Sequence, residues 1–194
     1  HIAAEIQKIL PDSPALLYRA LIAQSARWPE RAHNIEPERY AEVLRYIGYG
    51  IPDMVRATQN NEYRITLITN EQVEIGTREA HIYKIPIPQE LSEIGEDFEI
   101  LIEVTLSYSA KPRRTRRTVK RYLSTWLEWE SSRLGEDFET FKHRILVTGR
   151  SIDDDGGIKW AIGSARTWGM AKDFSRRNGT LQKDWAKIKS HELR

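Results

Sequence analysis

The chain has 194 residues, enough for one large domain with a buried core or for one and a half small ones. Charged residues make up 30% and hydrophobic residues 40%, and no apolar run approaches the roughly 18 residues of a membrane-spanning helix, so fibrous and membrane-spanning classes are excluded. The formal net charge of +2 gives no indication of a polyanionic partner.

The first 58 residues show the apolar spacing of helices. Residues 2–10 carry isoleucine at helical spacing from the first position, with no polar capping residue before them. We therefore expect a helix that continues from a segment upstream of His1. A second helix is predicted for residues 14–27, with Ser13 as the N-cap and Pro14 at the first helical position.

The apolar residues of the second helix surround its axis, which predicts that the helix is covered on more than one side. They are Leu16, Leu17, Ala20, Leu21, Ile22, Ala23 and Ala26. A third helix is predicted in residues 37–48, where a single apolar stripe ends at Gly48, a residue that favours the left-handed stop of a helix. Its one-sided stripe indicates a surface helix.

Beyond residues 58–63 the apolar period falls toward two, as in β-strands. The clearest case is residues 98–108, where Phe98, Ile100, Ile102, Val104, Leu106 and Tyr108 alternate with mostly polar residues. This alternation predicts an antiparallel sheet with one packed face and one wet face, as in a sandwich. Shorter strands are predicted at 63–69, 72–75, 81–88, 143–149 and 158–163. Residues 119–134 fit a helix or a strand, and the strand is preferred.

Three segments among the first 58 residues follow a distinctive order. Residues 2–10 are followed by a proline-containing turn and by residues 15–26, and residues 47–57 read IGYGIPDMVRA. In this order they resemble the end of the catalytic domain of subtilisin-like serine peptidases: the continuation of the helix that begins at the nucleophilic serine, the next helix, and the closing Tyr-Gly-x-Gly-x-x-(Asn/Asp)-x-x-x-Ala signature. Residues 37–48 would be an insertion.

The rest of the chain resembles a β-rich extension in a set of bacterial members of this family, through stretches such as HIYKIPIPQEL and YLSTWLEW. The resemblance implies an α+β fold. Residues 1–58 would be the last helices of an α/β subtilisin-like catalytic domain. Residues 59–194 would form an all-β, antiparallel, sandwich-like (jelly-roll-like) domain.

The resemblance also implies that the parent protein hydrolyses peptide bonds with Asp, His and Ser and without an organic cofactor. The family's Gly-Thr-Ser segment is missing from this sequence, and the family's Asp and His segments precede that serine. This chain alone is therefore expected to be inactive, and to support the catalytic domain or to recruit a substrate or partner. The partners implied are its own catalytic domain and the protein or peptide substrate of the parent.

The residues themselves offer no acyl-transfer site. His81 and His143 each open a predicted strand, where a structural role is favoured over catalysis. Ser164 lacks the Gly-x-Ser-x-Gly turn of a nucleophilic serine.

The acidic residues of 151–157 are consecutive, which favours a solvated hairpin turn over a calcium site. Cysteine is absent, so thiolate metal sites are excluded, and the compartment stays undetermined with the cytoplasm favoured. No catalytic, cofactor or metal residue is assigned.

The strongest local charge feature is a basic loop that consists of Arg113, Arg114, Arg116, Arg117, Lys120 and Arg121. Tyr122, Trp126 and Trp129 follow it, an arrangement compatible with a single-stranded nucleic-acid groove. Acidic residues between 90 and 99 could offset this charge, so a solvated or partner-facing loop is favoured over nucleic acid. The alternative function is therefore a non-enzymatic module that binds protein or nucleic acid through this loop. The six tryptophans are interpreted as core and rim anchors rather than a sugar platform.

Four apolar side chains of the predicted helices, Ile2, Ile6, Leu17 and Leu21, would form an exposed patch without the rest of a catalytic domain. We therefore expect either self-association into a homo-oligomer through these helices or their packing on the β domain. No membrane partner is expected.

Overall fold

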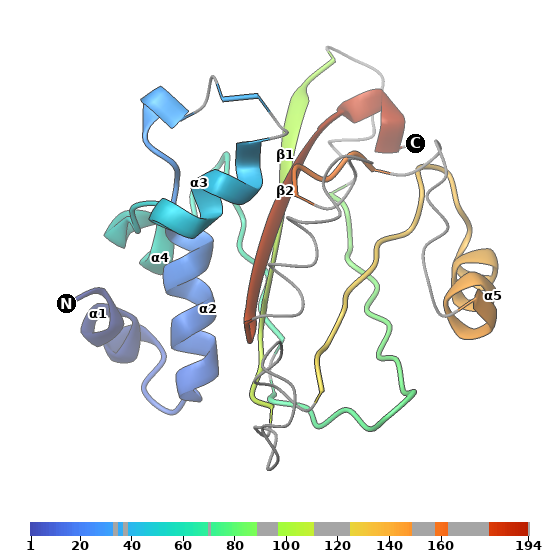
Figure 1. Ribbon diagram of the computed structural model, residues 1–194, viewed down its shortest axis with the longest axis horizontal. Coiled ribbons are helices and arrows are strands. Elements are labelled where there is room, and N and C mark those ends of the chain that lie inside the picture. Colours follow the sequence, from blue (N-terminus) through green and yellow to red (C-terminus); the bar gives the residue numbers. More distant parts are fainter. Residues whose placement is uncertain are drawn as a thin grey trace.

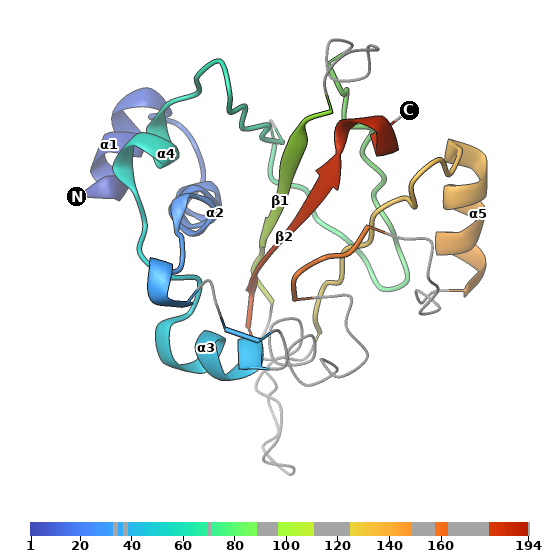
Figure 2. The same cartoon turned by 90° about the horizontal axis from the view of Figure 1, so that it is seen from above.

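The computed structural model describes residues 1–32, 35–36, 39–69, 71–88, 97–110, 125–148, 158–162 and 179–193. Its helices are α1 (Ile2–Ile9), α2 (Ala15–Ser25), α3 (Tyr40–Ile47), α4 (Met54–Thr58) and α5 (Phe138–Thr148), and its strands are β1 (Glu99–Ser107) and β2 (Leu181–Lys189). Figures 1 and 2 show α1–α4 on one side of the sheet and α5 on the other. Mixed helix and sheet is therefore confirmed, which is the coarse part of the predicted α+β fold.

Helices α1, α2 and α4 pack around a common apolar core made by Ile6, Leu21 and Ala57. Ile2 and Leu17 are partly buried against this core, so the four side chains expected to form an exposed patch are instead covered within the helical region. The Tyr18 hydroxyl donates to the carbonyl of Leu10 at 2.7 Å and fastens the turn between α1 and α2.

Helix α2 is shorter than predicted at both ends. It begins at Ala15, with Pro14 in extended conformation at the N-cap position, so Pro14 is not the first helical residue and Ser13 is not the N-cap. The helix ends at Ser25 because Arg27 enters a β-bridge with Ile51. The amide of Arg27 donates to the Ile51 carbonyl at 3.0 Å, and the amide of Ile51 donates to the Arg27 carbonyl at 2.8 Å.

Helix α3 belongs to a second apolar core. Val43 and Leu44 are buried with Trp28, and the Trp28 ring meets Tyr40 and Trp185 edge to face at 4.9 and 5.0 Å between ring centres. Helix α3 ends at Gly48 as predicted, with a positive φ of +56°, but the ψ of −134° differs from that of the left-handed helical conformation. Trp28 and Trp160 are buried and Trp185 is partly buried, as expected of core and rim anchors.

Strand β1 confirms the strand predicted at 98–108, and its antiparallel partner is β2, which was not among the predicted strands. The register runs from Glu99 opposite Lys189 to Ser107 opposite Leu181. On one face Ile100 and Ile102 of β1 lie opposite Ile188 and Ala186, both of which are buried. Val104 and Leu106 lie opposite the buried polar residues Asp184 and Gln182.

The other predicted strands are wrong for the residues that the structure describes. Residues 143–148 belong to α5, whose start is capped by Asp137: its carboxylate accepts from the amides of Glu139 at 3.0 Å and Thr140 at 3.1 Å. An aspartate at the N-cap satisfies amides that a helix leaves unpaired, and this local bonding outweighs the period of two. No strand is assigned in 63–69, 72–75, 81–88, 125–134 or 158–162.

The bridge between Arg27 and Ile51 requires glycine at position 50. The φ of Gly50 is +96°, and a Cβ there would lie 2.0 Å from the carbonyl oxygen of Arg27. Gly48 also has a positive φ, but a Cβ there would meet nothing within 4 Å.

We therefore expect G50A to lower the free energy of unfolding by about 3 kcal/mol or more, since backbone strain and a steric clash act together. G48A, which adds strain alone, should cost about 1 to 3 kcal/mol. Urea unfolding of both variants measures this difference. Equal losses would contradict the close approach at Gly50.

Candidate functional site

The polar face of the sheet is the surface on which α2 packs. Glu103, Thr105 and Ser107 of β1 and Lys183 of β2 hydrogen-bond or ion-pair with residues of α2 or its C-terminal end. The alternation in β1 predicted a wet second face. The structure corrects this for Glu103, Thr105 and Ser107, which meet polar side chains of α2, whereas Glu99 and Leu101 at the other end of the strand are exposed. Trp185 on the same face adds an apolar contact with Trp28. On the opposite face the apolar side chains of β1 are accompanied by Gln182 and Asp184, which are buried and bond the Leu127 carbonyl and the Ile162 amide.

A buried charge cluster joins the C-terminal end of α2 to the sheet. The Lys183 amine donates to the carbonyls of Gln24 at 3.0 Å and Ala26 at 2.6 Å, and lies 3.4 Å from Oε1 of Glu103. The Arg27 guanidinium pairs with Oε2 of the same carboxylate. The side chain of Lys183 is 2% exposed and that of Glu103 is 12% exposed. We call Arg27, Glu103 and Lys183 the interface cluster.

Burial shifts the titration of both cations in the interface cluster. It lowers the pKa of Lys183 to about 8, although the negative charge of Glu103 acts in the opposite direction. It also lowers the pKa of Arg27, again opposed by Glu103. The charged amine of Lys183 is therefore held where its loss of hydration outweighs the attraction of its counterion.

Arg19 fastens the N-terminal half of α2 to the end of the sheet where β1 stops and β2 starts. Its Nε donates to the Ser107 hydroxyl at 2.9 Å, and one terminal nitrogen donates to the Thr180 hydroxyl at 3.0 Å. The other terminal nitrogen donates to the carbonyls of Tyr108 and Thr180, both at 2.7 Å. The planar guanidinium suits this set of acceptors because its donors point in fixed directions.

Tyr49 covers the edge of β2 that does not pair with β1. Its hydroxyl donates to the Leu181 carbonyl at 3.3 Å and accepts from the Lys183 amide at 3.0 Å. Further along the same edge, the amide of Ala161 donates to the Trp185 carbonyl at 2.7 Å.

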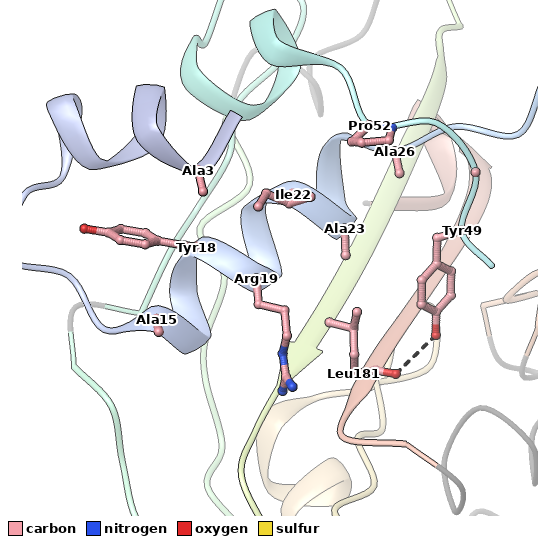
Figure 3. Close-up of a pocket in the computed structure, with 11 residues that line it drawn as sticks. Ala3, Ala15, Tyr18, Arg19, Ile22, Ala23, Ala26, Tyr49, Pro52 and Leu181 are labelled. Atoms are coloured by element: carbon pink, nitrogen blue, oxygen red, sulfur yellow. Dashed lines mark hydrogen bonds between the residues drawn. The ribbon is translucent and has the colours of Figure 1, made fainter. Parts of the chain in front are cut away.

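A groove of about 560 Å³ lies beside α2, between α1 and the start of β2. Figure 3 shows its walls, with Ala23 and Ile22 on α2, Ala3 on α1, and the Tyr49 hydroxyl directed at Leu181. The polar groups in the walls already have partners, since Arg19 and Tyr49 bond to the sheet. The groove therefore presents small apolar side chains rather than a nucleophile and a base.

Ser190, His191 and Asp97 lie together, but they do not form a catalytic triad. Oδ1 of Asp97 accepts from the Ser190 hydroxyl at 3.1 Å and lies 2.9 Å from Nδ1 of His191. In a triad the serine donates to the histidine, which in turn donates to the acid. Here both groups bind the same carboxylate oxygen, and Ser190 also accepts from the Phe98 amide at 3.1 Å. These hydrogen bonds attach the C-terminal turn at Ser190–Leu193 to the start of β1.

Several predicted site residues lie outside the described residues. These are the basic loop (Arg113, Arg114, Arg116, Arg117, Lys120 and Arg121), the turn at 151–157, and Ser164. His81 and His143 are both exposed, and His143 is on α5 rather than on a strand. Of the acidic residues expected to offset the basic loop, Asp97 bonds His191 and Glu99 pairs with Lys187 at 2.8 Å.

Over the described part of the chain, no group of three or more His, Cys, Asp or Glu side chains is placed to hold a metal ion. No helix within the same residues is long and apolar enough to cross a membrane.

Sequence reasoning did not single out Arg19, Arg27, Glu103 or Lys183. The available signal was in the stretch LQKDWAKIK, where Lys183 falls on the same strand face as Leu181 and Trp185. A charged residue between two large apolar ones on a single face indicates a buried charge with a partner.

Comparison with known proteins gives one informative match. A stretch of 115 residues, 59% of this chain, is 33% identical to a protein of Sinorhizobium fredii that is named only as uncharacterized protein y4bN. The chain covers 26% of that relative's length. No family model and no solved structure matches the chain.

The interface cluster predicts a large difference between two carboxylates on the same face of β1. E103Q would leave Lys183 and Arg27 buried without a counterion, and should lower the free energy of unfolding by about 3 to 5 kcal/mol. E99Q removes only the exposed pair with Lys187 and should leave the free energy of unfolding almost unchanged. Urea unfolding at neutral pH measures both. A loss in E103Q no larger than in E99Q would contradict the burial of the cluster.

The hydrogen bonds of Asp97 to Ser190 and His191 predict how the stability of the fold changes with pH. The hydrogen bond from His191 is the largest cause that lowers the pKa of Asp97. The ionised Asp97 therefore stabilises the fold at neutral pH, and this contribution is lost as the pH falls through the lowered pKa. In H191A the pKa of Asp97 should rise toward its ordinary value. Carboxyl-carbon NMR titration of both proteins measures this shift, and an unchanged midpoint would rule out the bond.

Proposed function

We propose that this chain is the C-terminal region of a subtilisin-like serine endopeptidase. In this proposal residues 1–58 complete the catalytic domain and residues 59–194 form a β-rich extension that supports it. The parent enzyme would hydrolyse peptide bonds in protein or peptide substrates. A serine upstream of this chain would attack the carbonyl carbon, a histidine would take its proton, and an aspartate would orient the histidine.

The observation that carries the proposal is the joint packing of α1, α2 and α4. These helices come from the three segments that resemble the end of the peptidase domain, and they share the core at Ile6, Leu21 and Ala57. The helix treated as an insertion, α3, packs in the other core with Trp28. The three resembling helices therefore share one core and α3 belongs to the other, while Tyr49 of the signature also packs against the core of Trp28.

The second glycine of the signature also has a defined structural role. Gly50 allows the backbone to approach Arg27 so closely that a Cβ would collide with its carbonyl. The signature then continues into Asp53, whose carboxylate caps α4 by accepting from the Arg56 amide at 2.7 Å. Both residue types are thus needed to return the chain from α2 to α4.

The polar contacts of α2 favour a supporting role for the extension. Arg19 and the interface cluster hold this helix against β1 and β2 at both of its ends. An extension attached in this way restricts the movement of a helix that the proposal assigns to the catalytic domain. The relative from Sinorhizobium fredii is more than twice as long as this chain, since 115 of its residues are 26% of its length, so it has room for a further domain.

A fluorophosphonate probe, which reacts covalently with activated serines, tests the proposal. The product of the complete gene should be labelled, and mass spectrometry should place the label on a Gly-Thr-Ser serine that precedes the residue corresponding to His1. The matched control replaces that serine by alanine in the same product. The 194-residue chain should not be labelled. Failure to label the complete product, or a label on any serine of this chain, would contradict the proposal.

A further inference from the structure

The interface cluster contains two cations and one anion. Glu103 of β1 offers one carboxylate oxygen to Lys183 and the other to Arg27, so its single negative charge is shared. Arg56 of α4 adds a further positive potential at Lys183. The Tyr49 hydroxyl contacts the backbone amide of Lys183. The groups from β1, α2 and α4 that face the amine therefore leave the cluster with an excess positive charge.

Only one of the two cations in the cluster can readily lose its charge. An arginine guanidinium stays protonated in proteins, whereas a buried lysine can be neutral near physiological pH. After losing its proton, the Lys183 amine keeps two N–H donors for the two carbonyls that it already meets, those of Gln24 and Ala26. Glu103 keeps Arg27 as its counterion. The cluster would then be balanced, with every hydrogen bond to α2 retained.

We propose that the seating of α2 on the β1–β2 sheet is proton-linked, and that it is tightest when the Lys183 amine is neutral. With the amine charged, closing the interface removes a cation from water and places it beside a second cation. With the amine neutral, that penalty disappears while the contacts of Arg19 and Tyr49 stay the same. The interface thus adjusts to pH through one side chain. This inference is independent of the peptidase proposal.

The sign of the effect follows from the two states. Burial lowers the pKa of Lys183 to about 8, against an ordinary value of 10.5 once the interface is open. Between these values the open form binds a proton that the closed form does not. The equilibrium therefore moves toward the closed form as the pH rises from about 8 to 10.5, by up to about tenfold per pH unit. Below pH 8 both forms are protonated, and this contribution is constant.

The first test is an NMR titration of the wild-type chain with carbon-13 at the lysine ε position, assigned by comparison with K183M. The Lys183 signal should move with a midpoint near 8. A midpoint at the ordinary lysine value would overturn the proposal. This measurement needs the wild-type fold for the titration itself, so it decides the question even where a variant is unstable.

The second test measures urea unfolding of the wild type, K183M and K187M at pH 7, 8, 9 and 10. Lys187 is the matched control, because it is on the same face of β2 and pairs with Glu99 at the surface. The unfolding constant of the wild type should fall with pH relative to that of K183M, by up to about tenfold per unit above pH 8. K187M should follow the wild type. Parallel curves for wild type and K183M, or loss of the dependence in K187M, would overturn the proposal.

Discussion

The polar contact between α2 and the sheet is the interaction on which the arrangement of this chain depends. Helices α1 and α4 reach the sheet chiefly through α2, because they pack against α2 and share its core. Arg19 holds one end of that helix and the interface cluster holds the other. These bonds give partners to Glu103, Thr105 and Ser107, whose side chains would otherwise lose hydration without replacement, while Trp185 on the same face packs against Trp28.

The use of charge rather than apolar area at this contact has energetic consequences. Burying Lys183 and Glu103 removes hydration that their mutual attraction replaces only in part, and the lowered pKa of Lys183 reflects this. Such a contact adds little net stability. It disfavours other positions of α2 on the sheet, because any shift of the helix would leave a buried charge unpaired. Helix and sheet are therefore held in a defined register.

Sequence patterns predicted the elements whose determinants are local. The helices at 2–10 and 37–48 and the strand at 98–108 were found from apolar spacing, and the stop at Gly48 from residue type. Strand β2 was not predicted because its lysines interrupt the alternation of apolar and polar residues. Lys183 is buried only through partners more than 75 residues away in the sequence. The start of α5 depends on the cap at Asp137, which the alternation of apolar residues in 143–149 does not reveal. The interface cluster could not be predicted because Arg27, Glu103 and Lys183 are brought together only by tertiary packing.

Disulfide trapping tests most directly whether α2 lies on the face of the sheet that carries Glu103, Thr105 and Ser107, because the chain contains no cysteine of its own. Gln24 of α2 bonds Thr105 of β1, whereas Val104 points to the opposite face. Under mild oxidation Q24C should cross-link rapidly with T105C and not with V104C in the folded chain. Cross-linking of Q24C with V104C in preference to T105C would show that α2 covers the apolar face, and would contradict its packing against Glu103, Thr105 and Ser107.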